Sequence, residues 1–201
     1  MFLSPSDDAY VATNEVPGSS DVLVSEHLSI VMRQLIAAIG ESLGPIVDEP
    51  TALALLPPLL ERHLADPRLL EPTQRIFDAD NYKRHLLHAD EGGRFTVLAL
   101  TWLPGQVTPV HGHNAWGVVG IHDGIMENTC YRIADDVVQE TTSVHTASVG
   151  HVARVESGDG SAHSLRNPGS ARAITIHVYG MDLAAEPTGV NRYYDNVSLS
   201  A

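Results

Sequence analysis

The chain has 201 residues, enough for one domain with a sizeable hydrophobic core and too few for two full domains. Its 12 Lys and Arg residues stand against 25 Asp and Glu residues, for a formal net charge of -13. Because binding to phosphates needs clustered cations, we expect neither nucleic acid nor an anionic membrane surface as a partner. Small molecules or other proteins therefore remain as the expected binding partners.

The first residues and the cysteine content bear on location. Cys130 is the only cysteine, so an intrachain disulfide is excluded. The opening residues lack the basic start and apolar run of a signal peptide, and no apolar stretch approaches the roughly 20 residues that span a bilayer. A cytoplasmic location is the default expectation.

The N-terminal third of the chain predicts a tail followed by helices. Residues 1–20 are rich in Ser, Asp, Pro and Gly without a hydrophobic period, so we expect a mobile N-terminal tail. From Ser25, an expected N-cap, apolar residues recur at helical spacing, and a second apolar segment, residues 51–64, is broken at Pro57-Pro58. Residues 21–75 are therefore predicted to form short helices that pack on a larger body.

After Pro72 the pattern changes to brief strands and turns. Apolar runs at residues 82–87 and 95–102 are followed by further short segments separated by Gly, Asp and Asn. This spacing is typical of an all-β barrel or sandwich. We expect residues 21–201 to form a single domain, with the barrel over residues 76–195.

Two histidines, His111 and His113, are spaced so that both side chains leave the same face of an extended strand. Gly105 lies six positions before His111, and a later His163 is followed four residues on by Asn167. This two-part pattern resembles the cupin family, whose fold is a double-stranded β-helix, or jelly-roll barrel. The prediction is a mainly β cupin barrel with an N-terminal helical extension.

In the usual cupin a glutamate follows the His-x-His pair as a further ligand, and here Gly117 occupies that place. The expected metal site therefore has three histidines and no carboxylate. A His-x-His pair alone is more often a surface or turn feature, but the glycine spacing and His163 favour a metal site. Three other histidines without such a context are interpreted as ordinary strand or surface residues: His122, His145 and His151.

A second polar row occurs in the last predicted strand, residues 173–180. Thr175, His177 and Tyr179 share one face, while three aliphatic residues share the other. Since an unpaired polar group costs roughly 2–7 kcal/mol to bury, these groups must be bonded to one another or face a polar cavity. The hypothesis is a hydrogen-bonded relay that ends in a phenol near the metal.

The chain resembles the bacterial thiol dioxygenases of the cysteine dioxygenase type. The resemblance is carried by residues 82–87, 102–113, 116–120, 163 and 175–180 and extends over residues 25–195, nearly the whole folded chain. It implies that His111, His113 and His163 bind one Fe(2+) ion, and that both atoms of O2 are added to the sulfur of a small thiol, with cysteine as the expected substrate, to give a sulfinate. It also implies that the family's catalytic Ser-His-Tyr relay corresponds to Thr175, His177 and Tyr179.

Departures from the family and choices within it concern four positions. Gly112 replaces an Asp that many relatives carry between the two histidines and that is not a ligand. Gly117 rules out the cysteine–tyrosine cross-link of mammalian members. Arg84 matches the arginine that binds the substrate carboxylate in cysteine-using members, where 3-mercaptopropionate enzymes have glutamine, although it could also belong to a solvated basic turn. Arg192 is a rival carboxylate ligand.

Three hypotheses of function follow. The first is an oxidoreductase that incorporates two oxygen atoms into cysteine. The second is a dioxygenase for 3-mercaptopropionate or another thiol acid such as mercaptosuccinate. The third is a non-catalytic ligand-binding cupin whose metal is structural or absent. The expected partners are a small thiol and O2, with the chain as a monomer or weak homo-oligomer.

Overall fold

The computed structural model describes residues 22–45, 48–135, 137–182 and 192–194, so the predicted tail lies outside the described residues. Two helices, α1 (Ile30–Leu43) and α2 (Glu49–Leu64), and a 3₁₀ helix, Pro72–Arg75, precede most of the strands. The strands are β1 (Val22–Val24), β2 (Lys83–Ala89), β3 (Thr96–Trp102), β4 (His111–His113), β5 (Gly117–Asp123), β6 (Ile125–Ala134), β7 (Val137–Ser148), β8 (Val152–Val155), β9 (Gly158–Arg166), β10 (Ala173–Tyr179) and β11 (Arg192–Tyr193).

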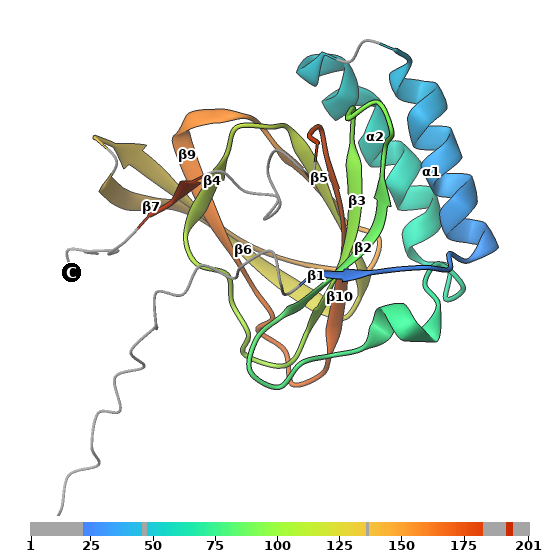
Figure 1. Ribbon diagram of the computed structural model, residues 1–201. Coiled ribbons are helices and arrows are strands. Elements are labelled where there is room, and N and C mark those ends of the chain that lie inside the picture. The colour runs from blue at the N-terminus through green and yellow to red at the C-terminus, as the bar shows by residue number, and fades with distance from the viewer. Residues whose placement is uncertain (1–21, 46–47, 136, 183–191, 195–201) are drawn as a thin grey trace, which may run out of the picture.

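The strands form two sheets that face each other as a barrel (Figure 1). One sheet has the order β1-β2-β3-β10-β5-β8 and the other the order β11-β4-β9-β6-β7. The neighbours pair antiparallel, apart from β1 and β2, which are parallel. This is the mainly β barrel with N-terminal helices that the sequence predicts. Within the described residues, neither helix has the length and apolar character needed to cross a membrane.

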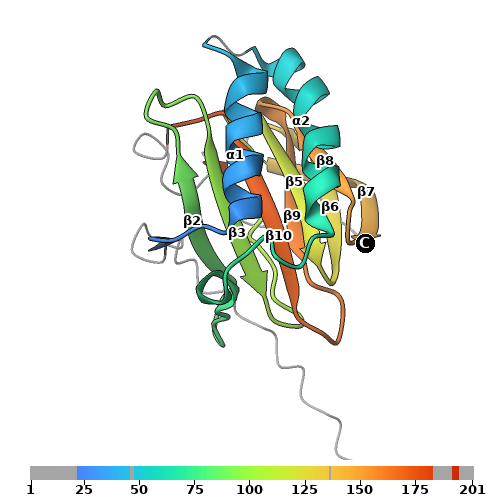
Figure 2. The same ribbon diagram turned by 90° about the vertical axis from the view of Figure 1, so that its right-hand side faces the viewer.

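Helices α1 and α2 cover the outer face of the six-stranded sheet, as Figure 2 shows. The aliphatic face of β10, with Ile174, Ile176 and Val178, belongs to one buried cluster with Leu35 of α1 and Leu60 of α2. The opposite face of β10 points into the barrel. The central strands of this sheet are therefore buried on both faces, which is why β3 and β10 are buried along their whole length.

The first predicted helix begins later than expected. Ser29, and not Ser25, is the N-cap of α1, because its side chain accepts a hydrogen bond from the backbone N–H of Met32. The residues before it, Val22–Val24, pair with β2 as strand β1. Part of the predicted helical extension therefore belongs to the barrel sheet.

The predicted break at Pro57-Pro58 is also wrong, since α2 runs through both prolines. A proline inside a helix leaves the carbonyl four residues earlier without its usual donor. For Pro57 that carbonyl belongs to Leu53, and it accepts a hydrogen bond of 2.8 Å from Nε of Arg154 in β8. For Pro58 it belongs to Ala54, which is exposed to water. The barrel therefore supplies the partner that the helix has lost.

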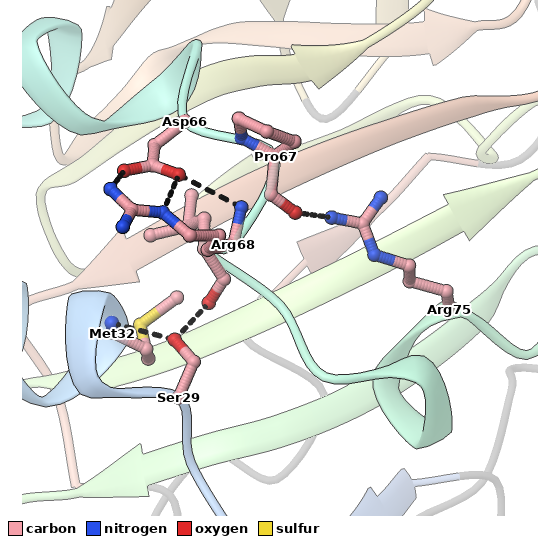
Figure 3. A network of polar contacts seen from close by, with 7 residues as sticks. Ser29, Met32, Asp66, Pro67, Arg68 and Arg75 are labelled. Atoms are coloured by element: carbon pink, nitrogen blue, oxygen red, sulfur yellow. Dashed lines mark hydrogen bonds and ion pairs between the residues drawn. The ribbon is translucent and has the colours of Figure 1, made fainter.

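The segment that connects α2 to β2 is held by polar contacts (Figure 3). The Ser29 hydroxyl donates to the backbone oxygen of Leu69 at 2.8 Å, and Arg75 donates to the backbone oxygen of Pro67 at 2.7 Å. Arg75 also lies 3.0 Å from Nε2 of His122, whose Nδ1 donates to the backbone oxygen of Leu64. His122 is thus a buried structural residue, and burial lowers its pKa.

Replacing Ser29 with Ala should destabilise the protein. The change removes the N-cap of α1 and leaves the buried Leu69 carbonyl without its donor, so we expect a loss of about 1–3 kcal/mol in the free energy of unfolding. Urea unfolding of the variant and the wild type measures this difference in the free energy of unfolding. Ser29→Thr, which keeps the hydroxyl, should stay close to the wild type, and equal stability of the Ala variant would contradict this role.

Candidate functional site

Three buried histidines meet inside the barrel. His111 and His113 extend from β4, and His163 comes from β9, where it lies directly opposite His111. One nitrogen of each ring lies within 4.8 Å of the others. Among the described residues, these three are the group of His, Cys, Asp and Glu side chains that is arranged to hold a metal ion, so the structure brings the three predicted ligands together.

The rings are oriented by hydrogen bonds on their far side. Nδ1 of His111 donates to the backbone oxygen of Pro109 at 2.8 Å, and Nδ1 of His163 donates to Oδ1 of Asn128 at 3.0 Å. Since each Nδ1 carries the proton, each Nε2 keeps a lone pair. Histidines that bind metals are held in this way, with the second nitrogen donating to a carbonyl.

The electrostatics of the site suit a cation. Burial lowers the pKa of His111 to about 4 and that of His163 well below its ordinary value, so both rings are neutral near neutral pH. The neutral ring is the form that binds metals. Nε2 of His113 and Nε2 of His163 lie 3.1 Å apart, and a cation beside them would accept both lone pairs. The donor set therefore fits a metal ion held by three imidazoles.

The polar row of β10 is buried, and its members are bonded to one another. Thr175 Oγ1 lies 2.8 Å from Nε2 of His177, and Nδ1 of His177 lies 2.8 Å from the hydroxyl of Tyr179. Burial lowers the pKa of His177 to about 3 and raises that of Tyr179, so both groups are neutral. The chain of contacts matches the expected relay.

Trp102 fixes the direction of this chain. Its indole N–H can only donate, and it donates to Thr175 Oγ1 at 2.9 Å. Among the described residues, Nε2 of His177 is the acceptor within hydrogen-bond distance of the Thr175 hydroxyl. The hydroxyl therefore donates its proton there, and Nδ1–H of His177 donates to the oxygen of Tyr179. The proton of Tyr179 is consequently left to point away from the relay.

The Tyr179 ring lies next to the histidines because Gly117 has no side chain. The ring stacks on that of His113 with centroids 5.4 Å apart and an interplanar angle of 22°. Tyr179 pairs with Gly117 across β10 and β5, and a Cβ at Gly117 would lie 2.7 Å from Cδ1 of Tyr179. A side chain at position 117 therefore cannot coexist with this ring position.

A small cavity, here called the Tyr179 cavity, brings the candidate residues together. It encloses about 30 Å³, and a single water needs roughly 10–15 Å³ by the same measure. Arg84 is 4% exposed and contributes to the wall with His111, His177 and Tyr179. The remaining lining residues are Tyr82, Leu98, Leu100, Thr108, Leu165 and Tyr193.

Arg192 is placed differently from Arg84. It pairs with Gly112 across β11 and β4, whereas the next residue, Tyr193, pairs with His111. Successive side chains in a strand point to opposite faces, so Tyr193 faces the cavity and Arg192 lies on the other face. Arg192 is not among the residues that line the Tyr179 cavity.

Sequence reasoning assigned no role to four residues of this site. Tyr82, just before β2, stacks on Trp102 with ring centroids 4.7 Å apart and lines the cavity. Tyr193 and Asn128 come from strands far away in the chain, so no local pattern links them to the histidines. Trp102 and Tyr82 stand within the segments that resemble thiol dioxygenases, which is the one signal that marked them.

The sequence matches the cysteine dioxygenase type I family over residues 69–187, more than half of the chain. The protein belongs to this family. The match begins before β2 and continues beyond β10, so it includes the three histidines, Arg84 and the polar row of β10.

Three solved structures are similar to part of this chain. TT1209 from Thermus thermophilus is 17% identical, with a TM-score of 0.45, over 56% of this chain and 96% of that one. The Schizosaccharomyces pombe Cnp3 cupin domain is 18% identical, with a TM-score of 0.41, over 55% and 73%. An oxalate oxidase in complex with the substrate analogue glycolate is 15% identical, with a TM-score of 0.42, over 52% and 53%. The assignment to the family rests on the sequence match.

Gly117→Ala should displace the Tyr179 ring, because the added methyl group would overlap with it. We expect a loss of about 1–3 kcal/mol in the free energy of unfolding and a broken contact between Tyr179 and His177. A crystal structure and urea unfolding of the variant check both. The matched control is Gly40→Ala in α1, where the new methyl group meets its nearest atom at 3.7 Å. An unmoved ring in Gly117→Ala would contradict this account.

Proposed function

We propose that this protein is a non-haem iron thiol dioxygenase that adds both atoms of O2 to the sulfur of cysteine, giving cysteine sulfinate. One observation carries the proposal: in a chain of the cysteine dioxygenase type I family, a buried arginine, a neutral metal-binding histidine and a tyrosine hydroxyl line the same small cavity. Arg84, His111 and Tyr179 are those residues.

The three histidines support ferrous iron as the metal. His111, His113 and His163 would hold it through neutral nitrogens, so no ligand charge offsets that of the ion. Bound there, iron would favour the thiolate form of the substrate and provide the redox chemistry with O2. The side chains of the cavity wall would bind the substrate and position its reacting atoms.

Arg84 is proposed to bind the carboxylate of the substrate. Its guanidinium is buried beside the cavity, and a planar pair of N–H donors matches the two oxygens of a carboxylate. The small volume of the cavity, about 30 Å³, would exclude a large thiol. Tyr179, whose proton points away from His177, is proposed to donate a hydrogen bond to the reacting atoms, with Thr175 and His177 holding it in place.

A second candidate substrate is 3-mercaptopropionate or a related thiol acid such as mercaptosuccinate. Among the described residues that line the Tyr179 cavity there is no Asp or Glu to pair with the ammonium group of cysteine. A thiol acid without that group would lose no contact with this wall. The cavity would then select thiols that bear a carboxylate, whether or not they also carry an ammonium group.

The function is tested by oxygen consumption of iron-loaded protein with a panel of thiols, followed by mass detection of the sulfinate. We expect turnover with cysteine, or with a thiol acid of similar size, and about one iron per chain. His163→Ala should lose iron and activity, whereas His27→Ala, at an exposed histidine before α1, should keep both. Full iron content in His163→Ala, or no oxygen uptake with any thiol, would exclude the proposal.

Arg84→Gln should raise KM for thiols that bear a carboxylate. Loss of a charged hydrogen bond costs roughly 1.5–3 kcal/mol, which corresponds to about a 10- to 150-fold change in kcat/KM. Cysteamine, which has no carboxylate, should be affected little. The matched change Arg192→Gln, on the other face of β11, should leave these constants near the wild type. If Arg192→Gln raises KM for these thiols more than Arg84→Gln does, Arg192 and not Arg84 binds the carboxylate.

A further inference from the structure

A second, larger cavity lies between the two sheets, here called the Met126 cavity. It encloses about 440 Å³. Strands β5, β8 and β10 of one sheet and β6, β7 and β9 of the other contribute to it. Its buried aliphatic lining consists of Val119, Ile121, Met126 and Leu165, and the other lining residues are Asn128, His145, Thr146, Ala147, His151, Ala153 and Thr175.

The interior of this cavity is apolar, and its polar groups lie at the rim or are already bonded. His145, Thr146 and His151 are exposed at the mouth. The Thr175 hydroxyl is bonded to Trp102 and His177, and Asn128 accepts from His163. Among the described lining residues there is no Lys, Arg, Asp or Glu. An anionic thiol acid would find no charged partner here, and burying it would be costly.

The Met126 cavity is one side chain away from the candidate metal centre, since none of the three histidines lines it. Leu165 lines both this cavity and the Tyr179 cavity, so a single side chain is their common wall. Leu165 follows His163 by two residues in β9, and the two side chains therefore point to the same side of the strand. Asn128, on another wall, is the hydrogen-bond partner of His163.

We propose that the Met126 cavity is the binding site and route for dioxygen, with Leu165 as the partition that separates it from the thiol. This inference rests on the proposed function. The Tyr179 cavity is small, and another cavity of about 210 Å³ beside the three histidines is lined by the charged side chains of Arg154 and Glu156, so neither offers an apolar path for the second substrate. Dioxygen is apolar, and apolar cavities in proteins bind small apolar molecules such as xenon. The anionic thiol would thus bind in the cavity that Arg84 lines, and the apolar dioxygen would enter through the Met126 cavity.

The test closes the mouth of the Met126 cavity. Ala147 on β7 lines it and is half-buried, whereas its neighbour Ser148 is exposed and does not line it. Ala147→Trp should lower kcat/KM for oxygen on the order of tenfold, while the KM for the thiol and the iron content stay near those of the wild type. Ser148→Trp, the matched control, should change none of these values.

A second measurement needs no iron and no turnover. Crystals of the wild type under xenon pressure should show xenon between Val119, Met126 and Leu165, and crystals of Ala147→Trp should not. Met126→Trp fills the cavity from within and replaces Ala147→Trp if that variant does not fold. An active enzyme whose kcat/KM for oxygen is the same in both plugged variants and the control overturns the inference, as does a wild type without xenon. Absence of oxygen uptake by the wild type with every thiol overturns the proposed function instead.

Discussion

The site depends on one strand, β10, whose two faces are both buried and have opposite chemistry. The aliphatic face holds the helices on the outside of the barrel, and the polar face enters the interior. Burial of that polar face is tolerated because each group finds its partner in the next: Thr175 in His177, and His177 in Tyr179. The same helices that stabilise the fold therefore fix the position of the tyrosine, because a shift of β10 would move both faces together.

The indole of Trp102 gives this polar row a direction. A hydroxyl and an imidazole can each donate or accept, so the row alone would permit protons to point either way. The Trp102 N–H takes one lone pair of Thr175 Oγ1, and Nε2 of His177 is the acceptor that the described residues offer to the Thr175 proton, so the Tyr179 proton is left at the cavity end. Trp102 also stacks on Tyr82, which lines the same cavity. One side chain thus connects the far end of the relay with the cavity wall.

Much of this arrangement could be predicted from local sequence patterns. The period of two in residues 173–180 and the spacing of His111 and His113 each define a face, and a face is a local property. The start of α1 and the course of α2 could not be predicted, because they depend on partners distant in the sequence. The carbonyl that Pro57 leaves without a donor is bonded by Arg154, 101 residues after Leu53, and Ser29 is held by Leu69. Tyr193 and Asn128 reach the site through strand pairing, which no local pattern shows.

Gly117 connects the chemistry of the metal centre with its geometry. A glutamate at this position would add a negative ligand, and any side chain would begin 2.7 Å from the Tyr179 ring. Glycine at this position leaves three histidines and no carboxylate as the candidate donors, and it leaves space for a tyrosine stacked on His113. Burial keeps His111 and His163 neutral, so neither ring would offset the charge of a bound cation. An anion is therefore favoured in the Tyr179 cavity, which Arg84 lines, over the Met126 cavity, which has no Lys, Arg, Asp or Glu among its described lining residues.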